Sequence, residues 1–198
     1  MPCTSRFRVA SRRETTLGLQ TVQAIGANRF RPFLRESVAR AAWYQGDAPV
    51  ARRIMLESVQ EVRELGMERF IGPWLMGTLA LVDPDSRADA LAEGQQMLEQ
   101  GAVGHNHFHF HMLGIEACLD SGDLDGVEWH ADALDAYTTE HPNPWSDFQI
   151  QRARALAAAG RGDRQRETLM MLRERGRGVG LVTELRRLDD ALRDGTSG

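Results

Sequence analysis

The stretch GAVGHNHFHFHMLGIEACLDSGDLDGVEWHADALDAYTTEHPNPWSDF, residues 101–148, contains one complete copy of a pattern that recurs along the chain. It reads as a helix, a turn at Gly122-Asp123 and a second helix. The same turn, an aspartate after a glycine or a proline, recurs at separations of 38, 38 and 40 residues. The aspartates are Asp47, Asp85, Asp123 and Asp163. A period near 38 with a polar turn is typical of stacked helix pairs.

Small residues accompany this turn. Five positions before the aspartates, the chain has Ala42, Ala80, Cys118 and Ala158. Two helices joined by a short turn approach closely near it, and a bulky side chain there would hold them apart. We therefore predict that Ala80 and Cys118 are buried against a partner helix. We also expect the aspartates to cap the second helices by accepting hydrogen bonds from free backbone N–H groups.

Apolar residues at the helical period extend this pattern over the whole chain. In the central pair, Phe108, Met112, Ile115 and Leu119 are expected on one face. The other predicted helices cover residues 15–28, 31–45, 48–65, 70–82, 85–100, 145–159, 163–175 and 181–193. No strand pattern competes with them. The sequence therefore predicts an all-α fold, an α-solenoid of stacked antiparallel helix pairs over residues 15–195, with a capping helix at its C-terminal end.

The first residues of the chain differ from the rest. Arg6, Arg8, Arg12 and Arg13 are accompanied by no acid in the first 13 positions. We interpret residues 1–14 as a disordered basic lead-in. An organellar transit peptide is the alternative interpretation, because such peptides are rich in arginine and serine and poor in acids.

Composition limits the chemistry and the partners. All 24 lysine or arginine positions are arginine, which removes a phosphate-loop lysine, Schiff-base chemistry and a lysine general base. Residues 101–150 carry 9 acids and no arginine, which argues against a continuous nucleic-acid track. The sequence has no run of 18 apolar residues and no secretory signal pattern, and Cys3 and Cys118 lie far apart. We therefore predict a cytoplasmic protein that binds neither nucleic acid nor membrane.

The central pair opens with four histidines at alternate positions: His105, His107, His109 and His111. On a helix, residues at i and i+4 share a face, and such a histidine pair can chelate Zn²⁺ or Ni²⁺ through neutral imidazoles. Carboxylates such as Glu116 or Glu128 could complete a site. One hypothesis is therefore a metal-binding protein or an enzyme centred on residues 105–111. The other is that these histidines pack against neighbours or lie on the surface.

Several motifs between positions 101 and 160 carry a family resemblance. They are Gly101, His105-Asn106-His107, Phe110, Ile115-Glu116-Ala117, Leu119, Gly122-Asp123, Ala133-Leu134, Ala136-Tyr137-Thr138, Pro142, Pro144-Trp145-Ser146-Asp147 and Arg154-Ala155-Leu156. With these motifs the chain resembles the C-terminal, tetratricopeptide-like region of large bacterial regulators, in which a class III adenylate/guanylate cyclase domain and an ATPase domain precede helical repeats. A weaker match reaches back through Gly66 to residues 70–73. The chain departs from the family at His109, His111 and His141.

The catalytic parts of that family are missing from this sequence. Its ATPase needs a phosphate loop, GxxxxGK followed by serine or threonine, which a chain without lysine cannot contain. Its cyclase needs two metal-binding carboxylates on a sheet, which an all-α chain does not offer. The resemblance therefore implies a non-catalytic regulatory module in signalling, without a cofactor. Its expected partner is a protein or peptide segment, such as the upstream cyclase or ATPase domains.

Tandem helix pairs also predict a place for that partner. The first helices of stacked pairs line a concave groove that can hold a peptide or a helix. The aromatic residues that the pattern places there are Trp74, Phe108, Trp145 and Phe148. Aromatic side chains at helical spacing also form cores, and the sequence leaves both roles open. It leaves the oligomeric state open as well.

Overall fold

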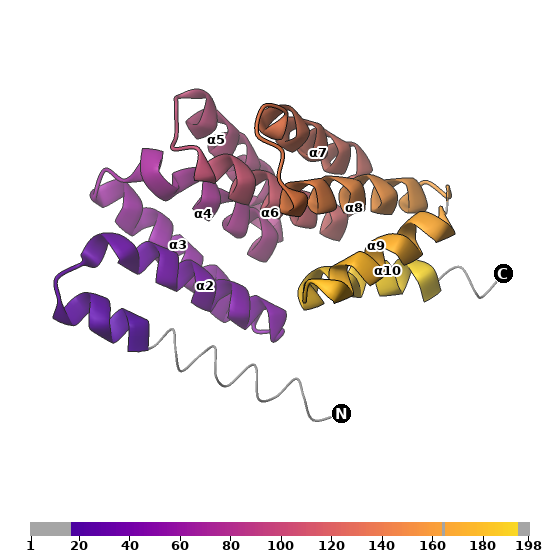
Figure 1. Ribbon diagram of the computed structural model, residues 1–198. Coiled ribbons are helices and arrows are strands. Elements are labelled where there is room, and N and C mark those ends of the chain that lie inside the picture. The colour runs from indigo at the N-terminus through magenta and orange to yellow at the C-terminus, as the bar shows by residue number, and fades with distance from the viewer. Residues whose placement is uncertain (1–16, 164, 194–198) are drawn as a thin grey trace. The chain divides into compact units, whose positions relative to one another are not determined.

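The computed structural model of the chain describes residues 17–163 and 165–193, and every regular element in this part is a helix (Figure 1). The prediction of an all-α chain is confirmed for these residues. The predicted basic lead-in, residues 1–14, lies outside them. After a helix over residues 17–24, the elements are η1 (Asn28–Phe30), α2 (Arg31–Tyr44), α3 (Ala48–Glu64), α4 (Glu68–Val82), η2 (Pro84–Ser86), α5 (Arg87–Glu99), α6 (His105–Ser121), α7 (Leu124–Thr138), α8 (Pro144–Gly160), α9 (Arg166–Gly178) and α10 (Val182–Arg193). In the described part, no helix has the length and apolar character that crossing a membrane requires.

Residue contacts divide the chain into two compact units, Met1–Leu113 and Gly114–Gly198, with the boundary inside α6. Within the first unit, each of α2, α3 and α4 packs on the next helix, and α2 also packs directly on α4. Within the second unit, each of α7, α8 and α9 packs on the next helix, and α8 also packs directly on α10. The sequence pattern predicts one domain over residues 15–195, because its period continues across Leu113.

Two of the recurrent turns have the predicted structure. The side chains of Asp47 and Asp123 each accept a hydrogen bond from the backbone N–H three residues later, at 3.4 and 2.9 Å. The preceding residues, Gly46 and Gly122, have φ angles of 85° and 74°, a left-handed conformation that glycine adopts without a steric penalty. Each of these turns therefore ends one helix and caps the next.

The turn around Asp85 differs from the prediction. Asp85 lies inside η2 instead of capping a helix, because Pro84 begins a 3₁₀ turn one residue earlier and α5 starts only at Arg87. The buried carboxylate at this turn is that of Asp83, which accepts a hydrogen bond from Ser86 Oγ at 2.7 Å. A carboxylate therefore stabilises this turn too, but from another position.

The ninth helix also differs from the prediction, at both ends. Expected over residues 163–175, it runs from Arg166 to Gly178 and passes through Gly176. A Cβ on Gly176 would lie 2.9 Å from Leu185 Cδ2 and 3.1 Å from Phe148 Cζ. The glycine therefore allows other side chains to pack closely against α9 and does not end the helix.

The small residues before two turns are buried as predicted. Ala80 and Cys118 are 0% and 2% exposed. A Cβ on Gly126 of α7 would lie only 2.7 Å from Cys118 Sγ. Consecutive helices therefore approach closely beside this turn, as the small residues indicate.

The buried face of α6 matches the predicted one only in part, since Ile115 is buried and Leu119 packs against the core of the second unit. Phe110 is fully buried, whereas Phe108 and Met112 are half-buried. Two glycines of the first unit make room for Phe110: a Cβ on Gly94 of α5 would lie 2.3 Å from its ring, and a Cβ on Gly77 of α4 would lie 3.3 Å from its backbone. The apolar period of α6 does not reveal that Phe110 is buried, because glycines of α4 and α5 create the space for this residue.

The last helix contributes an apolar stripe to the core of the second unit. Leu188 and Leu192 are buried in this core together with Phe148. Leu181 and Leu185 are partly buried and pack against it. All four leucines of this stripe therefore contact the core.

Candidate functional site

Rings from three helices of the first unit contact one another, and we call them the ring cluster: Phe33, Phe70, Trp74, His105 and His109. Phe33 belongs to α2, Phe70 and Trp74 belong to α4, and the histidines belong to α6. Phe33 meets the two α4 rings edge-on, with centroids 5.8 and 5.5 Å away. Trp74 and His109 stack face to face, with centroids 3.6 Å apart and planes inclined by 7°. Phe70 is 41% exposed and the other four rings are half-buried.

A proline inside α4 explains why the chain before α6 joins this helix. Pro73 has no N–H, so the carbonyl of Arg69 loses its usual partner within the helix. Val103 replaces that bond, because its N–H donates to Arg69 O at 2.9 Å. The start of α6 is therefore held beside the middle of α4.

Asn106 completes this junction. Its side chain is fully buried and accepts a hydrogen bond from Trp74 N–H at 3.3 Å. Its amide nitrogen donates to Phe70 O at 3.1 Å and to Val103 O at 3.0 Å. A buried amide with several hydrogen bonds defines one register between two helices. Asn106 therefore positions the two histidines of the ring cluster against Trp74.

A fully buried carboxylate lies next to the ring cluster. Glu36 of α2 accepts a hydrogen bond from Thr78 Oγ1 at 2.9 Å, and its Oε1 lies 2.8 Å from Arg40 Nε. Burial raises the pKa of Glu36 above its ordinary value, although Arg40 opposes this shift. The carboxylate therefore connects α2 to α4 from within the protein and is not presented to solvent.

The stacked histidine is uncharged near neutral pH. Burial, together with the positive charge of Arg40 and the neighbouring His105, lowers the pKa of His109 to about 4. His109 Nδ1 and His105 Nε2 are both buried, and neither has a hydrogen-bond partner within the described ranges. These imidazoles therefore act in the ring cluster chiefly as packed aromatic rings.

The structure brings the four histidines together in the two expected i, i+4 pairs. The ring centroids of His105 and His109 are 6.4 Å apart, and those of His107 and His111 are 6.2 Å apart. His111 is only 3% exposed. Across residues 17–163 and 165–193, no three His, Cys, Asp or Glu side chains are arranged to hold a metal ion. The metal hypothesis stays a prediction.

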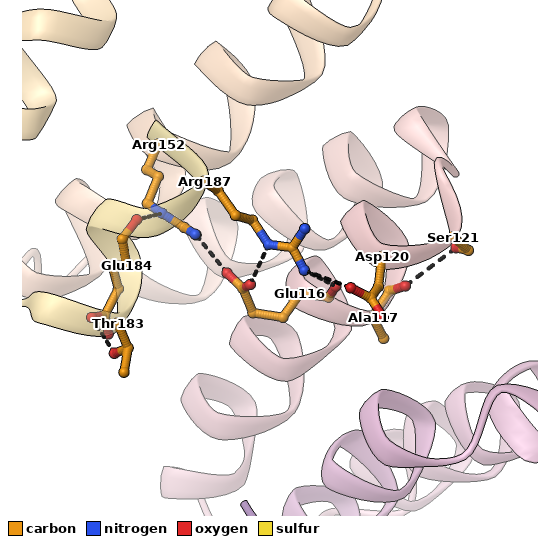
Figure 2. A network of polar contacts seen from close by, with 8 residues as sticks. All are labelled: Glu116, Ala117, Asp120, Ser121, Arg152, Thr183, Glu184 and Arg187. Atoms are coloured by element: carbon orange, nitrogen blue, oxygen red, sulfur yellow. Dashed lines mark hydrogen bonds and ion pairs between the residues drawn. The ribbon is translucent and has the colours of Figure 1, made fainter. Parts of the chain in front are cut away.

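The two carboxylates considered as additional metal ligands both pair with arginine. Glu128 accepts a hydrogen bond from Arg161 at 2.5 Å. Figure 2 shows that Glu116 lies between two guanidinium groups of the second unit. Its Oε1 accepts from Arg152 Nη1 at 2.5 Å, and its Oε2 accepts from Arg187 Nε at 2.8 Å.

This arginine–carboxylate network joins three helices of the second unit (Figure 2). Arg152 of α8 is 1% exposed and also donates to Glu184 O at 3.0 Å, and Arg187 of α10 also binds Asp120 at 3.0 Å. Burial alone would raise the pKa of Glu116, but the two arginines lower it below its ordinary value. The network therefore links α6, α8 and α10 to one another through ion pairs and hydrogen bonds.

The predicted groove residues do not share one environment. Trp74 belongs to the ring cluster, while Phe108 and Trp145 are half-buried. Phe148 is 2% exposed and lies in the core of the second unit, so the prediction of a groove position is wrong for this residue. The space left by Gly176 allows its ring to turn inward.

Three buried polar residues organise these sites in roles that the sequence did not predict: Glu36, Asn106 and Arg152. Glu36 had a detectable signal, because Pro32, Glu36 and Ala39 follow the helical period on the buried side of α2. Arg152 had no such signal, since α8 is buried over most of its surface. Asn106 lies in one of the motifs that carry the family resemblance, but its partners are backbone groups of another helix and of the chain before α6.

Comparisons with protein-family models, with curated proteins and with solved structures found no significant match to this chain. What the protein does must therefore be inferred from the arrangement of its own residues. Of the arrangements described above, the ring cluster has the properties of a binding surface, because it is aromatic, firmly positioned and partly exposed.

Proposed function

We propose that this chain is a non-catalytic helical-repeat module that binds a segment of another protein at the ring cluster. The observation that carries the proposal is the partial exposure of five mutually packed rings, of which Phe70 is 41% exposed. Aromatic and arginine side chains are enriched at the energetic centres of protein interfaces. Arg40, whose charge acts on His109, has 33% of its side chain exposed and can contribute to such a centre.

The rings are already held in place in the unbound chain. Trp74 is fixed from two sides, because its ring stacks on His109 and its backbone N–H is bound by Asn106. A partner that docks on positioned side chains loses little additional side-chain entropy. Preorganisation of this kind supports a role in binding.

The architecture that we propose for the module is a tetratricopeptide-like α-solenoid of stacked antiparallel pairs. The turn spacing of 38, 38 and 40 residues supports it, as does direct packing of α2 on α4 and of α8 on α10. In such arrays the first helices of successive pairs line the binding groove. The ring cluster comes from α2, α4 and α6, which hold that position in the repeat, so an extended or helical peptide would lie across all three.

The resemblance to cyclase–ATPase regulators supports a cytoplasmic, regulatory role. A segment of a signalling protein, such as a cyclase or ATPase domain, would be the natural partner of a module of this kind. The absence of lysine supports the non-catalytic part of the proposal, because an ATPase phosphate loop cannot form without it.

Selection of peptides from a displayed random library on the whole chain tests this proposal. The selected peptides are then titrated by fluorescence anisotropy against wild type, Phe70→Ser and Tyr44→Ser. Tyr44 is a matched control, because it is also 41% exposed but contacts Trp43, outside the ring cluster. We expect Phe70→Ser to weaken binding about tenfold or more and Tyr44→Ser to change it less than about threefold.

Two results would contradict the proposal. One is a library from which no binding peptide is recovered. The other is equal weakening by both substitutions, which would mean that the peptides do not distinguish the ring cluster from another exposed ring. Circular dichroism of both variants, recorded before the titrations, separates lost binding from lost folding.

A further inference from the structure

A hollow of about 430 Å³ lies between α9 and α10 of the second unit. Its lining residues are Arg166, Arg173, Asp189, Leu192 and Arg193. Three guanidinium groups and a single carboxylate thus surround a space of the size that small ligands occupy. The hollow carries an excess of positive charge.

Two of these arginines have hydrogen-bond donors without a protein acceptor among residues 17–163 and 165–193. Arg166 makes one long bond, from Nη1 to Leu192 O at 3.4 Å. Arg173 Nη1 lies 3.6 Å from Asp189 Oδ1, which is beyond hydrogen-bond distance. The Nε of Arg173 is buried and has no hydrogen-bond partner in the described part of the chain. A buried N–H without a partner destabilises the folded protein unless a ligand or a water molecule supplies the acceptor.

Other arginines of the same unit are used differently. Arg152, Arg154 and Arg187 each donate to a carboxylate, at 2.5, 2.7 and 2.8 Å. These short, charge-assisted bonds are typical of arginines that stabilise a fold. Among the described residues, Arg166 and Arg173 donate to no carboxylate at such a distance, and the buried Nε of Arg173 has no acceptor.

We propose that the hollow binds an oxyanion, the phosphate or carboxylate group of a small molecule, between Arg166 and Arg173. A guanidinium group presents pairs of N–H donors in a plane, and these match two oxygens of such an anion. Arg193, which contacts Asp190, adds positive charge to the hollow, whereas Asp189 opposes an anion. This site belongs to the second unit and does not depend on peptide binding at the ring cluster.

Calorimetry and thermal unfolding of the whole chain test the proposal. Sodium phosphate and sodium acetate are titrated separately, with sodium chloride holding the ionic strength constant. We expect saturable binding of phosphate, with a melting temperature that rises by about 3–6 °C at about ten times Kd. Binding of acetate as well would show that the site accepts a carboxylate. Binding of phosphate alone would assign it to phosphate groups.

Three substitutions in the hollow and one control locate the site. Arg173→Gln and Arg166→Gln should each weaken phosphate binding about tenfold or more, because each removes charge-assisted donors. Asp189→Asn should strengthen binding about threefold or more, because it removes the opposing carboxylate. Arg186→Gln makes the same charge change at an exposed position of α10 and should leave affinity within about twofold.

The proposal fails if neither anion binds saturably. It also fails if Arg186→Gln weakens phosphate binding as much as Arg173→Gln does, because general attraction to a positive surface would then explain the effect. The melting temperature of each variant in sodium chloride alone checks that it is folded. We expect Asp189→Asn to bind phosphate more tightly than wild type. Unfolding of the arginine variants could explain their weaker binding, but it could not explain this gain in affinity.

Discussion

The imidazole of His130 occupies the space that a side chain at Gly114 would need. A Cβ on Gly114 of α6 would lie 2.3 Å from Cε1 of His130 on α7, well inside van der Waals contact. His130 is 2% exposed, so its ring is enclosed by other protein atoms and cannot easily move away from Gly114. The pair therefore sets how closely α6 and α7 approach each other within the second unit.

Gly114→Ala is expected to destabilise the protein by about 1–3 kcal/mol, because its methyl group would overlap the His130 ring. This result would be contrary to helix propensity, which favours alanine over glycine. Gly178→Ala in α9 is the matched control, since nothing lies within 4 Å of its Cβ position. Urea unfolding followed by circular dichroism measures both changes, and equal midpoints for the two variants would contradict the packing of this pair.

Glu116→Gln should lower the free energy of unfolding by about 2–4 kcal/mol, because it removes the charge that balances Arg152, which is 1% exposed. Glu128→Gln is the control, because it removes a carboxylate from a pair with Arg161 on the surface. Surface pairs contribute little to stability, so its urea midpoint should stay close to that of wild type. Similar losses of stability in the two variants would mean that the network of Glu116 contributes no more to stability than a surface ion pair does.

His130 makes the stability of the chain depend on pH. Burial lowers the pKa of His130 to about 4, although Asp123 opposes this shift. Since an ordinary histidine titrates near 6.5, the unfolded chain takes up this proton before the folded chain does. The stability that depends on neutral His130 is therefore fully present above about pH 6.5 and is lost as the pH falls toward 4, by up to about 3 kcal/mol.

Nuclear magnetic resonance of the His130 side chain in ¹³C-labelled protein measures this directly. The Cε1 chemical shift should report a neutral ring down to about pH 4. A titration midpoint near 6.5 in the folded protein would contradict the buried, neutral state.

Metal analysis distinguishes a binding module from a metalloprotein. We expect protein purified without a histidine tag to contain no stoichiometric zinc or nickel, because His109 is stacked on Trp74 and His111 is 3% exposed. Elemental analysis tests this expectation. About one metal ion per chain, lost in His107→Ala, would instead favour the metal-binding hypothesis.

Local signals located the turns of this protein correctly where only a few residues determine them. At residues 46–47 and 122–123, a glycine with positive φ precedes an aspartate that caps the next helix. Both effects act within a few residues, so the sequence is sufficient to predict them. At Asp85 the same signal failed, because Pro84 begins a 3₁₀ turn first.

The candidate site could be predicted only in part. Trp74 and the histidine pairs follow from the sequence, but their contact does not. That contact depends on Pro73 of α4, which leaves a carbonyl free, and on Asn106 of α6, which binds the neighbouring backbone. Neither residue indicates its partner, since the partner lies about 30 residues away in the chain.

The sequence by itself determined that this chain is helical and where most of its helices begin and end, because helical period, caps and turns are local properties. Only the tertiary structure decided the burial of some side chains and supplied the partners of others. Phe110 enters the core in place of Phe108 because Gly94 of another helix leaves space for its ring. Glu36 is buried because Thr78 of α4 supplies a hydrogen bond to its carboxylate. Burial depends on partners that are distant in the chain, and the period of one helix carries no information about them.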